Sequence, residues 1–237
     1  MPNNLQKTQS TFSHYLKEII YGGNDGIITT FAVVAGFSGA SINDNFLNLS
    51  FLTVLLFGLA NLFADGLSMG LGNLLSVKAE QDVYNTNKEQ ELKSIQSNFE
   101  GQFDETIIML EKNGFKKPDA IALTNIFSRN VDYWLEWNML HKFNSTNPHT
   151  VHAIYTGIAT FLAFMAFGII PLLPFILLGT NTKYSFEFSA ISTFTALVLL
   201  GILKWQVVGR GLLVSVTEIV LIGGLAATVA YIVGRMF

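Results

Sequence analysis

The chain contains no cysteine and few charged residues. The lack of cysteine excludes a disulfide framework, a thiolate metal site and thiol redox chemistry. Only 13% of the 237 residues are charged, whereas 50% are hydrophobic. Soluble domains usually carry charge on about a quarter of their residues. The composition therefore argues against a soluble domain and is typical of a membrane protein.

Several catalytic motifs are also missing. The sequence has no P-loop and no nucleophile elbow, which argues against ATP-driven pumping and hydrolysis within this chain. It has no Glu-x-x-His pair of the di-iron carboxylate bundles. The histidines His141, His149 and His152 do not form a His-Glu-x-x-His site. No basic patch indicates nucleic-acid binding, so we expect neither an enzyme nor a nucleic-acid partner.

Five apolar stretches are long enough to cross a bilayer, which takes roughly 20 residues of helix. They lie at residues 19–40, 49–76, 151–178, 186–204 and 211–235. They predict an all-α, five-span integral membrane protein in which spans 1 and 2 lie within residues 19–76 and spans 3 to 5 within residues 151–237. The polar segment 1–18 does not resemble a signal peptide, so we expect the first span to be retained.

Lysine and arginine are unequally distributed around these spans. Twelve of the fourteen lie on the side that holds residues 1–18, residues 77–150 and the loop before the fifth span. Lys183 and Arg235 lie on the other side. Because cytoplasmic loops carry the excess of positive charge, we expect the N-terminus and residues 77–150 in the cytoplasm. A bacterial plasma membrane is our expectation, with a vacuolar or other organelle membrane as the alternative.

The segment between the second and third spans, residues 77–150, is rich in Lys, Glu, Asp, Asn and Gln. A structureless run of this length is unusual, and apolar residues recur in it at helical spacing. We therefore predict a cytoplasmic bundle of three or four short helices. From Phe51 to Tyr84 there is neither proline nor a turn cluster, so the second span is expected to continue into this bundle as one long helix.

Proline and glycine predict how the membrane helices pack. Pro171 and Pro174 each remove a backbone donor and should kink the third span near its outer end. Glycines on the second and fifth spans are expected to let helices approach closely. These glycines are Gly58, Gly66, Gly70, Gly72, Gly223, Gly224 and Gly234.

Three carboxylates stand out inside the predicted spans: Asp25, Asp65 and Glu218. An ionisable residue inside a membrane is costly, so each one is a functional candidate. Asp25 has an alternative role as the cap of a helix start near the interface. Glu218 is a candidate proton carrier, because a carboxylate in apolar surroundings can exchange protons near neutral pH. Its alternative role is that of a hydrogen-bonded structural carboxylate.

A polar stripe runs along the second span. Asn61, Asp65, Met69 and Asn73 recur every four residues and therefore lie on one helix face. Carboxylate oxygen suits hard divalent ions, and a thioether favours first-row transition metals over Ca²⁺ and Mg²⁺. The stripe is either a path for such a metal or a polar helix–helix seam in which Met69 fills a gap. Spacing alone does not decide between these two interpretations.

Residues 24–36 and 58–72 closely resemble the two signature spans of the vacuolar iron transporter family. Their sequences are NDGIITTFAVVAG and GLANLFADGLSMGLG. The resemblance extends to IPLLP at residues 170–174 and to IGGLAA at residues 222–227, so it covers the whole predicted membrane part. It implies a five-span homodimer that exports cytosolic Fe²⁺, and often Mn²⁺, in exchange for protons. The ion path would lie at the dimer interface between the first and second spans, with no permanently bound cofactor.

The resemblance also assigns roles to individual residues. Asp25 matches the first-span carboxylate of the family, and Met69 matches its second-span methionine. Asn61 stands where members commonly have glutamate, although Asp65 one turn further on can supply the carboxylate. Asn73 stands where they commonly have an acidic residue. We therefore predict that these five residues form the metal path and that the path is less anionic than usual.

The cytoplasmic segment departs further from the family, whose iron-collecting domain uses repeated glutamates and a Met-Met-x-x-Glu stretch after a tryptophan. In the corresponding stretch from Trp134 to Lys142, Met139 is the one methionine and Lys142 replaces the glutamate. Glu105, Glu111 and Met139 are the ligand candidates in this segment. We predict a degenerate metal-binding domain that is structural or regulatory and binds iron weakly.

Two functions of different classes follow from the sequence. The first is a proton-coupled exporter of Fe²⁺ or Mn²⁺. The second is a membrane sensor or interaction protein that keeps the fold and has lost transport. The second alternative is motivated by Asn61, Asn73 and the missing cytoplasmic ligands.

Overall fold

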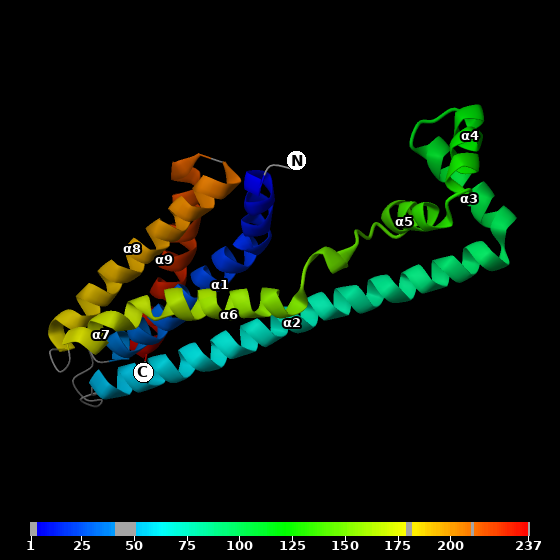
Figure 1. Ribbon diagram of the computed structural model, residues 1–237. Helices are drawn as coiled ribbons and strands as arrows, with labels where there is room; N and C mark the ends of the chain where they lie inside the picture. The colour runs from blue at the N-terminus through cyan, green and yellow to red at the C-terminus, as the bar shows by residue number, and fades with distance from the viewer. Residues whose placement is uncertain (1–3, 41–50, 179–181, 210, 237) are drawn as a thin grey trace. The chain divides into compact units, whose positions relative to one another are not determined.

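The computed structural model describes residues 4–40, 51–178, 182–209 and 211–236, and within these ranges it contains helices and no strand (Figure 1). The predicted all-α class is therefore confirmed. The chain divides into two compact units. Met1–Leu74 and Ala153–Phe237 form one, which we call the apolar unit, and Leu75–His152 form the other, which we call the polar unit.

Long helices build the apolar unit. They are α1 (Asn4–Ala40), the first part of α2 (Phe51–Ser97), α6 (Ala153–Gly168), α8 (Thr182–Val208) and α9 (Leu212–Met236). The prediction that the second span continues as one long helix is confirmed, because α2 has no interruption over 47 residues. α1 begins well before residue 19, so the expected N-terminal segment is partly helical. Residues 49 and 50 of the second predicted span, and Arg210, lie outside the described ranges.

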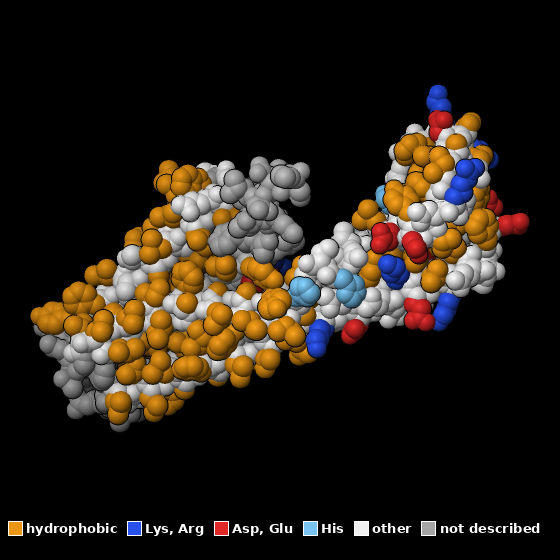
Figure 2. Space-filling model, viewed as in Figure 1, with side chains coloured by type: hydrophobic (Ala, Val, Ile, Leu, Met, Phe, Trp, Pro, Cys, Tyr) orange, Lys and Arg blue, Asp and Glu red, His pale blue; other side chains and the backbone are white. Residues whose placement is uncertain are grey.

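Four helical stretches of the described chain are long and apolar enough to cross a membrane: Leu52–Ser97, Ala153–Leu178, Tyr184–Val208 and Leu212–Met236. α1 does not meet this standard, because Gly22, Gly23, Asn24 and Asp25 interrupt its apolar sequence. Large apolar side chains cover the surface of the apolar unit (Figure 2). Soluble monomers rarely expose an apolar surface of this extent, so the unit is suited to a lipid environment.

Glycines mark the places where helices of the apolar unit approach most closely. A Cβ at Gly22 or Gly26 of α1 would meet the backbone of α6, and a Cβ at Gly234 of α9 would meet the backbone of Gly36 on α1. Gly70 on α2 faces the backbone of Gly157 on α6 in the same way. Such contacts are the usual means by which membrane helices associate.

The expectation of close approach is wrong for two of the predicted glycines. Gly72 and Gly224 have no atom within 4 Å of the position that a Cβ would take. Both lie on exposed helix faces, because the periodicity of α2 and α9 turns these positions away from their neighbours.

The third span is interrupted near its proline pair, where the sequence predicts a kink. α6 stops at Gly168 and is followed by a 3₁₀ turn, η2 (Ile170–Leu172), and by the short helix α7 (Leu173–Leu178). The break leaves backbone carbonyls without helical partners. Pro174 has no N–H, so the carbonyl oxygen of Ile170 loses its helical donor, and Ser192 Oγ of α8 donates to this oxygen at 3.4 Å. Ser189 Oγ of α8 donates to the carbonyl oxygen of Pro171 at 2.6 Å.

The polar unit consists of the last part of α2 and of three short helices, α3 (Phe99–Lys112), α4 (Lys117–Phe127) and α5 (Val131–His141), followed by the 3₁₀ turn η1 (Pro148–Thr150). The prediction of short helices in this segment is confirmed. Asn98 and Asn130 cap α3 and α5 through their side-chain oxygens. Trp134 is fully buried in the core of this unit, and its Nε1 donates to Thr106 Oγ1 at 2.9 Å.

Candidate functional site

One carboxylate of α1 and one of α2 lie within electrostatic range of each other. Asp25 lies in the middle of α1 and Asp65 in the first third of α2, and both are half-buried. Their negative charges interact with each other. Asn61 Nδ2 donates to Asp65 Oδ2 at 2.8 Å, which orients this carboxylate. The fold therefore brings two acidic groups and one amide of the predicted path into one region of the apolar unit.

The other two members of the stripe have different surroundings. Met69 is half-buried and packs against the apolar core around Leu62 and Phe164. Asn73 Nδ2 donates to Thr160 Oγ1 of α6 at 2.7 Å. Asn73 thus bonds α2 to α6, as the seam interpretation predicts, whereas Asn61 and Asp65 bond to each other on the same helix.

A groove of about 380 Å³ opens beside Asn61. It lies between α1, α2 and α9, and its lining includes Gly36, Phe37, Phe57, Asn61 and Gly234. The lining is mainly apolar, and Asn61 is its main polar side chain. One end of the polar stripe therefore borders open space within the apolar unit.

No group of three or more His, Asp or Glu side chains in the described ranges could hold a metal ion. Asp25 and Asp65 are the two carboxylates that one copy of the chain brings to the stripe. The amide of Asn61 and the thioether of Met69 are the neighbouring neutral donor types. This donor set is mixed oxygen and sulfur, a combination that suits first-row transition metals.

Glu218 has a counter-charge. Lys204 Nζ of α8 donates to Glu218 Oε2 of α9 at 2.5 Å. This ion pair joins neighbouring helices, so it fits the structural role that is one of the two alternatives for Glu218.

The three candidates in the polar unit have different environments. Glu105 receives a hydrogen bond from Lys142 at 2.7 Å. Glu111 is exposed near the end of α3, whereas Met139 is buried in the core with 1% of its surface exposed. Lys142 thus pairs with Glu105, a carboxylate that was a candidate for binding a metal ion in this unit.

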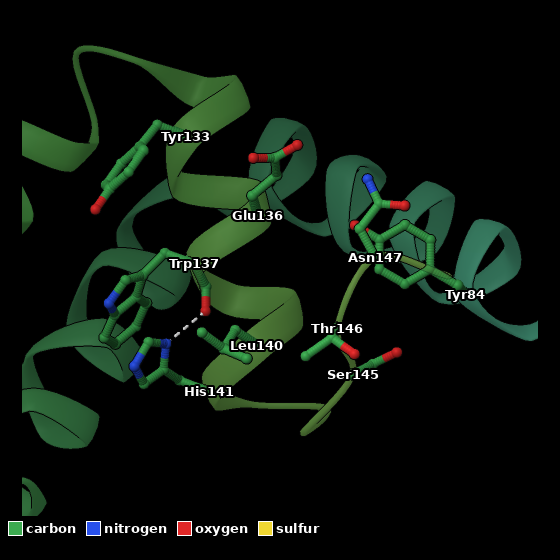
Figure 3. A pocket seen from close by; sticks show the side chains of 9 residues that line it. All are labelled: Tyr84, Tyr133, Glu136, Trp137, Leu140, His141, Ser145, Thr146 and Asn147. Atoms are coloured by element: carbon green, nitrogen blue, oxygen red, sulfur yellow. Dashed lines mark hydrogen bonds between the residues drawn. The ribbon is translucent and has the colours of Figure 1, made fainter. Parts of the chain in front are cut away.

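A pocket of about 480 Å³ on the polar unit contains none of these candidates (Figure 3). Tyr133, Trp137 and His141 line it from α5, and Tyr84 lines it from α2. The Trp137 and His141 rings stack with centroids 4.2 Å apart, and the His141 Nδ1 atom lies 2.9 Å from the Trp137 carbonyl oxygen. The imidazole is therefore engaged with its own helix.

Comparison with known families decides what kind of protein carries this arrangement of residues. The model of the VIT family matches residues 16–235, which is nearly the whole chain and includes both carboxylates of the site. The chain belongs to the VIT family. The members of this family are transporters, so the expectation that the chain is not an enzyme is confirmed.

Individual VIT relatives cover both units. A vacuolar iron transporter of Toxoplasma gondii is 33% identical over 240 residues, which cover 96% of this chain and 76% of the relative. One of Plasmodium falciparum is 34% identical over 227 residues, covering 92% of this chain and 81% of the relative. Vacuolar iron transporter 1 of Arabidopsis thaliana is 29% identical over 226 residues, which cover 95% of this chain and 87% of the relative. Together with the apolar helices, these relatives identify the chain as an integral membrane protein.

Sequence reasoning missed two buried carboxylates of this VIT chain. Glu91 of α2 has 3% of its surface exposed, and it lies on the same helix face as the buried Tyr84 and Ile95. Glu18 of α1 has 8% exposed, and its Oε2 atom has no hydrogen-bond partner among the described residues. Glu18 precedes Asp25 by seven residues, so the two share a helix face. In both cases the signal was helical spacing: Glu91 recurs with the apolar Tyr84 and Ile95, and Glu18 recurs with Asp25.

Proposed function

We propose that this VIT-family chain carries a divalent metal ion, Fe²⁺ or Mn²⁺, out of the cytosol in exchange for protons. The observation that supports it most directly is the electrostatic interaction between Asp25 of α1 and Asp65 of α2, both of which are half-buried. Asn61 orients one of these carboxylates, and Met69 follows one helical turn after Asp65. The relatives named vacuolar iron transporters favour iron as the cargo.

The chemistry of a carboxylate pair explains how metal and protons are exchanged. Two carboxylates whose charges interact repel each other unless a cation neutralises them. A divalent ion bound between Asp25 and Asp65 provides this neutralisation, and protons on the same oxygens provide it when the ion has left. Metal and protons therefore compete for one set of atoms, so that release of one is linked to uptake of the other.

The proposal includes a five-span topology in which α1 is the additional span. Ile27 and Val34 of α1 are almost completely buried inside the apolar unit, where α1 contacts α6, α8 and α9. A helix surrounded by three apolar helices has no need of the high mean hydropathy that a lipid-facing helix has. The polar unit and the N-terminus would lie in the cytoplasm and the C-terminus on the opposite side. The membrane would be a bacterial plasma membrane or, alternatively, a vacuolar one.

A homodimer is part of the same proposal. One copy brings only two carboxylates to the stripe, whereas a transition-metal site commonly uses four or more ligands. Half-buried Asp65 and Met69 on α2, and the open groove beside Asn61, leave this face accessible to a second copy. Pairing two copies there would double the number of carboxylates around the ion.

The direct test is metal flux in vesicles that contain the purified chain. Unmodified protein is expected to move Fe²⁺ and Mn²⁺ at a rate that depends on a pH gradient. Asp25→Asn and Asp65→Asn each remove a charge that the cation needs, so flux is expected to fall at least tenfold. Met69→Leu keeps the shape and removes the thioether, and it is expected to reduce Fe²⁺ flux more than Mn²⁺ flux, because Fe²⁺ binds thioether more favourably.

Matched controls separate these effects from general damage. Met165→Leu changes a half-buried methionine of α6 that packs against the same core, and Asp82→Asn changes an exposed aspartate of the polar unit. Both variants are expected to transport normally. Normal flux in Asp25→Asn and Asp65→Asn would reject the path. Absence of flux for every metal in the unmodified dimer would favour the alternative of a transport-inactive sensor or interaction protein.

A further inference from the structure

The ammonium group of Lys142 lies between two carboxylates of the polar unit. Its Nζ atom is 2.7 Å from Glu105 Oε2 and 3.2 Å from Glu91 Oε2. Glu91 is almost completely buried, with 3% of its surface exposed, whereas Glu105 is partly exposed. An unpaired buried carboxylate is strongly destabilising, so Glu91 needs a cation at this position.

Two amide side chains complete the cluster around this ammonium. Asn138 Nδ2 donates to Glu91 Oε1 at 2.9 Å. The amide nitrogen of Gln102, in the orientation that satisfies both of its polar atoms, donates to Glu91 Oε1 at 2.9 Å and to Glu105 Oε2 at 3.2 Å. Asn138 is completely buried, and its Oδ1 atom has no hydrogen-bond partner among the described residues.

The side chains in this cluster are those that bind hard divalent cations. The two carboxylates offer oxygen atoms, which Mn²⁺ and Ca²⁺ prefer as ligands, and the amide nitrogens of Asn138 and Gln102 hold these carboxylates in place. The one positive charge of Lys142 balances only one of the two carboxylates. A free divalent ion in the same position would balance both.

We propose that Lys142 is the built-in cation of the polar unit and that its ammonium fills a divalent-cation site formed by Glu91 and Glu105, whose carboxylates the neighbouring amides orient. The polar unit then folds without bound metal. Replacing the ammonium with an uncharged group opens the site to a divalent ion. This proposal concerns the polar unit alone and does not depend on transport through the apolar unit.

The protonation of Lys142 agrees with this role. Burial alone would lower the pKa of the ammonium, but the hydrogen bonds and charges of Glu105 and Glu91 together outweigh burial, and the pKa is raised above its ordinary value. The two carboxylates therefore favour the charged form of Lys142.

Two other lysines of the polar unit serve as comparisons. Lys93 pairs with Glu89 at 2.7 Å, but both side chains are about 70% exposed, and Lys88 lies 3.8 Å from the exposed Glu136. Exposed pairs of this kind contribute little to stability, because water solvates both charges. Lys142 differs from them because its partner Glu91 is buried.

The test is Mn²⁺ binding to the full-length chain in detergent, measured by equilibrium dialysis. Lys142→Met keeps the length and apolar stem of the side chain and removes its charge. This variant is expected to bind one more Mn²⁺ ion per chain than the unmodified protein, and Lys88→Met is expected to bind no more than the unmodified protein. Adding Glu91→Gln to Lys142→Met is expected to abolish the extra ion. Each comparison is a difference in bound Mn²⁺ between two variants of the same chain, so any Mn²⁺ bound in the apolar unit contributes equally to both and drops out.

Thermal unfolding followed by tryptophan fluorescence provides the second measurement. Without metal, Lys142→Met is expected to unfold at a lower temperature than the unmodified chain, and Mn²⁺ is expected to restore the difference. The double variant with Glu91→Gln should be more stable than Lys142→Met without metal and should not respond to Mn²⁺. The proposal is overturned if Lys142→Met gains no Mn²⁺, or if Mn²⁺ does not raise its unfolding temperature. It is also overturned if the unmodified chain already binds Mn²⁺ in a manner that Glu91→Gln removes.

Discussion

At the scale of single residues, Asn73 and Asp65 show that one polar stripe serves two purposes. Asp65 is oriented by Asn61 on its own helix, and its charge interacts with that of Asp25 on α1. Asn73 is bonded to Thr160 of α6, and Thr160 Oγ1 in turn donates to the carbonyl oxygen of Thr156. The first half of the stripe is suited to bind an ion, and Asn73 is suited to join two helices.

Substitution of Asn73 tests this division. Asn73→Leu removes the bond to Thr160, and interhelical hydrogen bonds in membranes contribute about 0.6 kcal/mol on average and up to roughly 1.7 kcal/mol. We expect a loss of stability in this range, measured by denaturant unfolding in detergent micelles, with metal flux close to that of the unmodified chain. Thr160→Val should lower stability by a similar amount. The double variant should lose no more stability than either single variant, because both substitutions remove the same hydrogen bond. A fall in flux as large as that of Asp65→Asn would instead assign Asn73 a ligand role.

At the scale of helices, the position of Asp25 depends on how closely α1 approaches α6. Gly26 follows Asp25 directly, and a Cβ at this position would fall against the backbone of Phe164. A backbone atom cannot move aside as a flexible side chain can. The absence of a side chain at Gly26 therefore sets the distance between α1 and α6, and with it the position of Asp25 relative to Asp65.

Gly26→Ala is accordingly expected to be harmful although it adds only one methyl group. Overpacking of this kind costs about 1 to 3 kcal/mol, and displacement of Asp25 is expected to reduce metal flux several-fold. Gly72→Ala is the matched control, because it adds the same methyl group to α2 in open space. The control should leave flux unchanged and stability within roughly 0.5 kcal/mol. Equal effects of the two substitutions would contradict the role of the α1–α6 crossing.

Sequence patterns predicted the helices better than the contacts between their side chains. The length of α2 and the break after α6 follow from apolar runs and from Pro171, which act within a few residues. The bond between Asn73 and Thr160 joins residues 87 positions apart, and that between Lys142 and Glu91 joins residues 51 apart. No local pattern connects such pairs, so the sequence marked Lys142 as a missing ligand and could not show which carboxylate it would neutralise.

At the scale of the whole molecule, the number of spans determines on which side each unit lies. Four stretches of the described chain meet the hydropathy standard for spans, and α1 does not, although it is at the centre of the apolar unit. If α1 spans the membrane, its N-terminal end lies on the same side as the polar unit. If α1 does not span it, that end lies on the opposite side.

Single cysteines can distinguish these two topologies, because the natural chain has none. Lys17→Cys lies near the start of α1, Glu111→Cys in the polar unit and Met236→Cys at the end of α9, and all three positions are exposed. In intact cells a membrane-impermeant maleimide is expected to label Met236→Cys alone, and the other two only after permeabilisation. Labelling of Lys17→Cys from outside would show that α1 does not cross the membrane.

The contact of Lys142 with Glu91 and Glu105 has a consequence for how the protein responds to metal supply. A group tethered to its partners by a short chain has an effective concentration of millimolar or more, whatever the solution contains. A free divalent ion at micromolar concentration would have to displace this ammonium before it could reach the two carboxylates. A cell that is starved of iron and a cell that is overloaded with it would therefore both contain a polar unit in the same folded state.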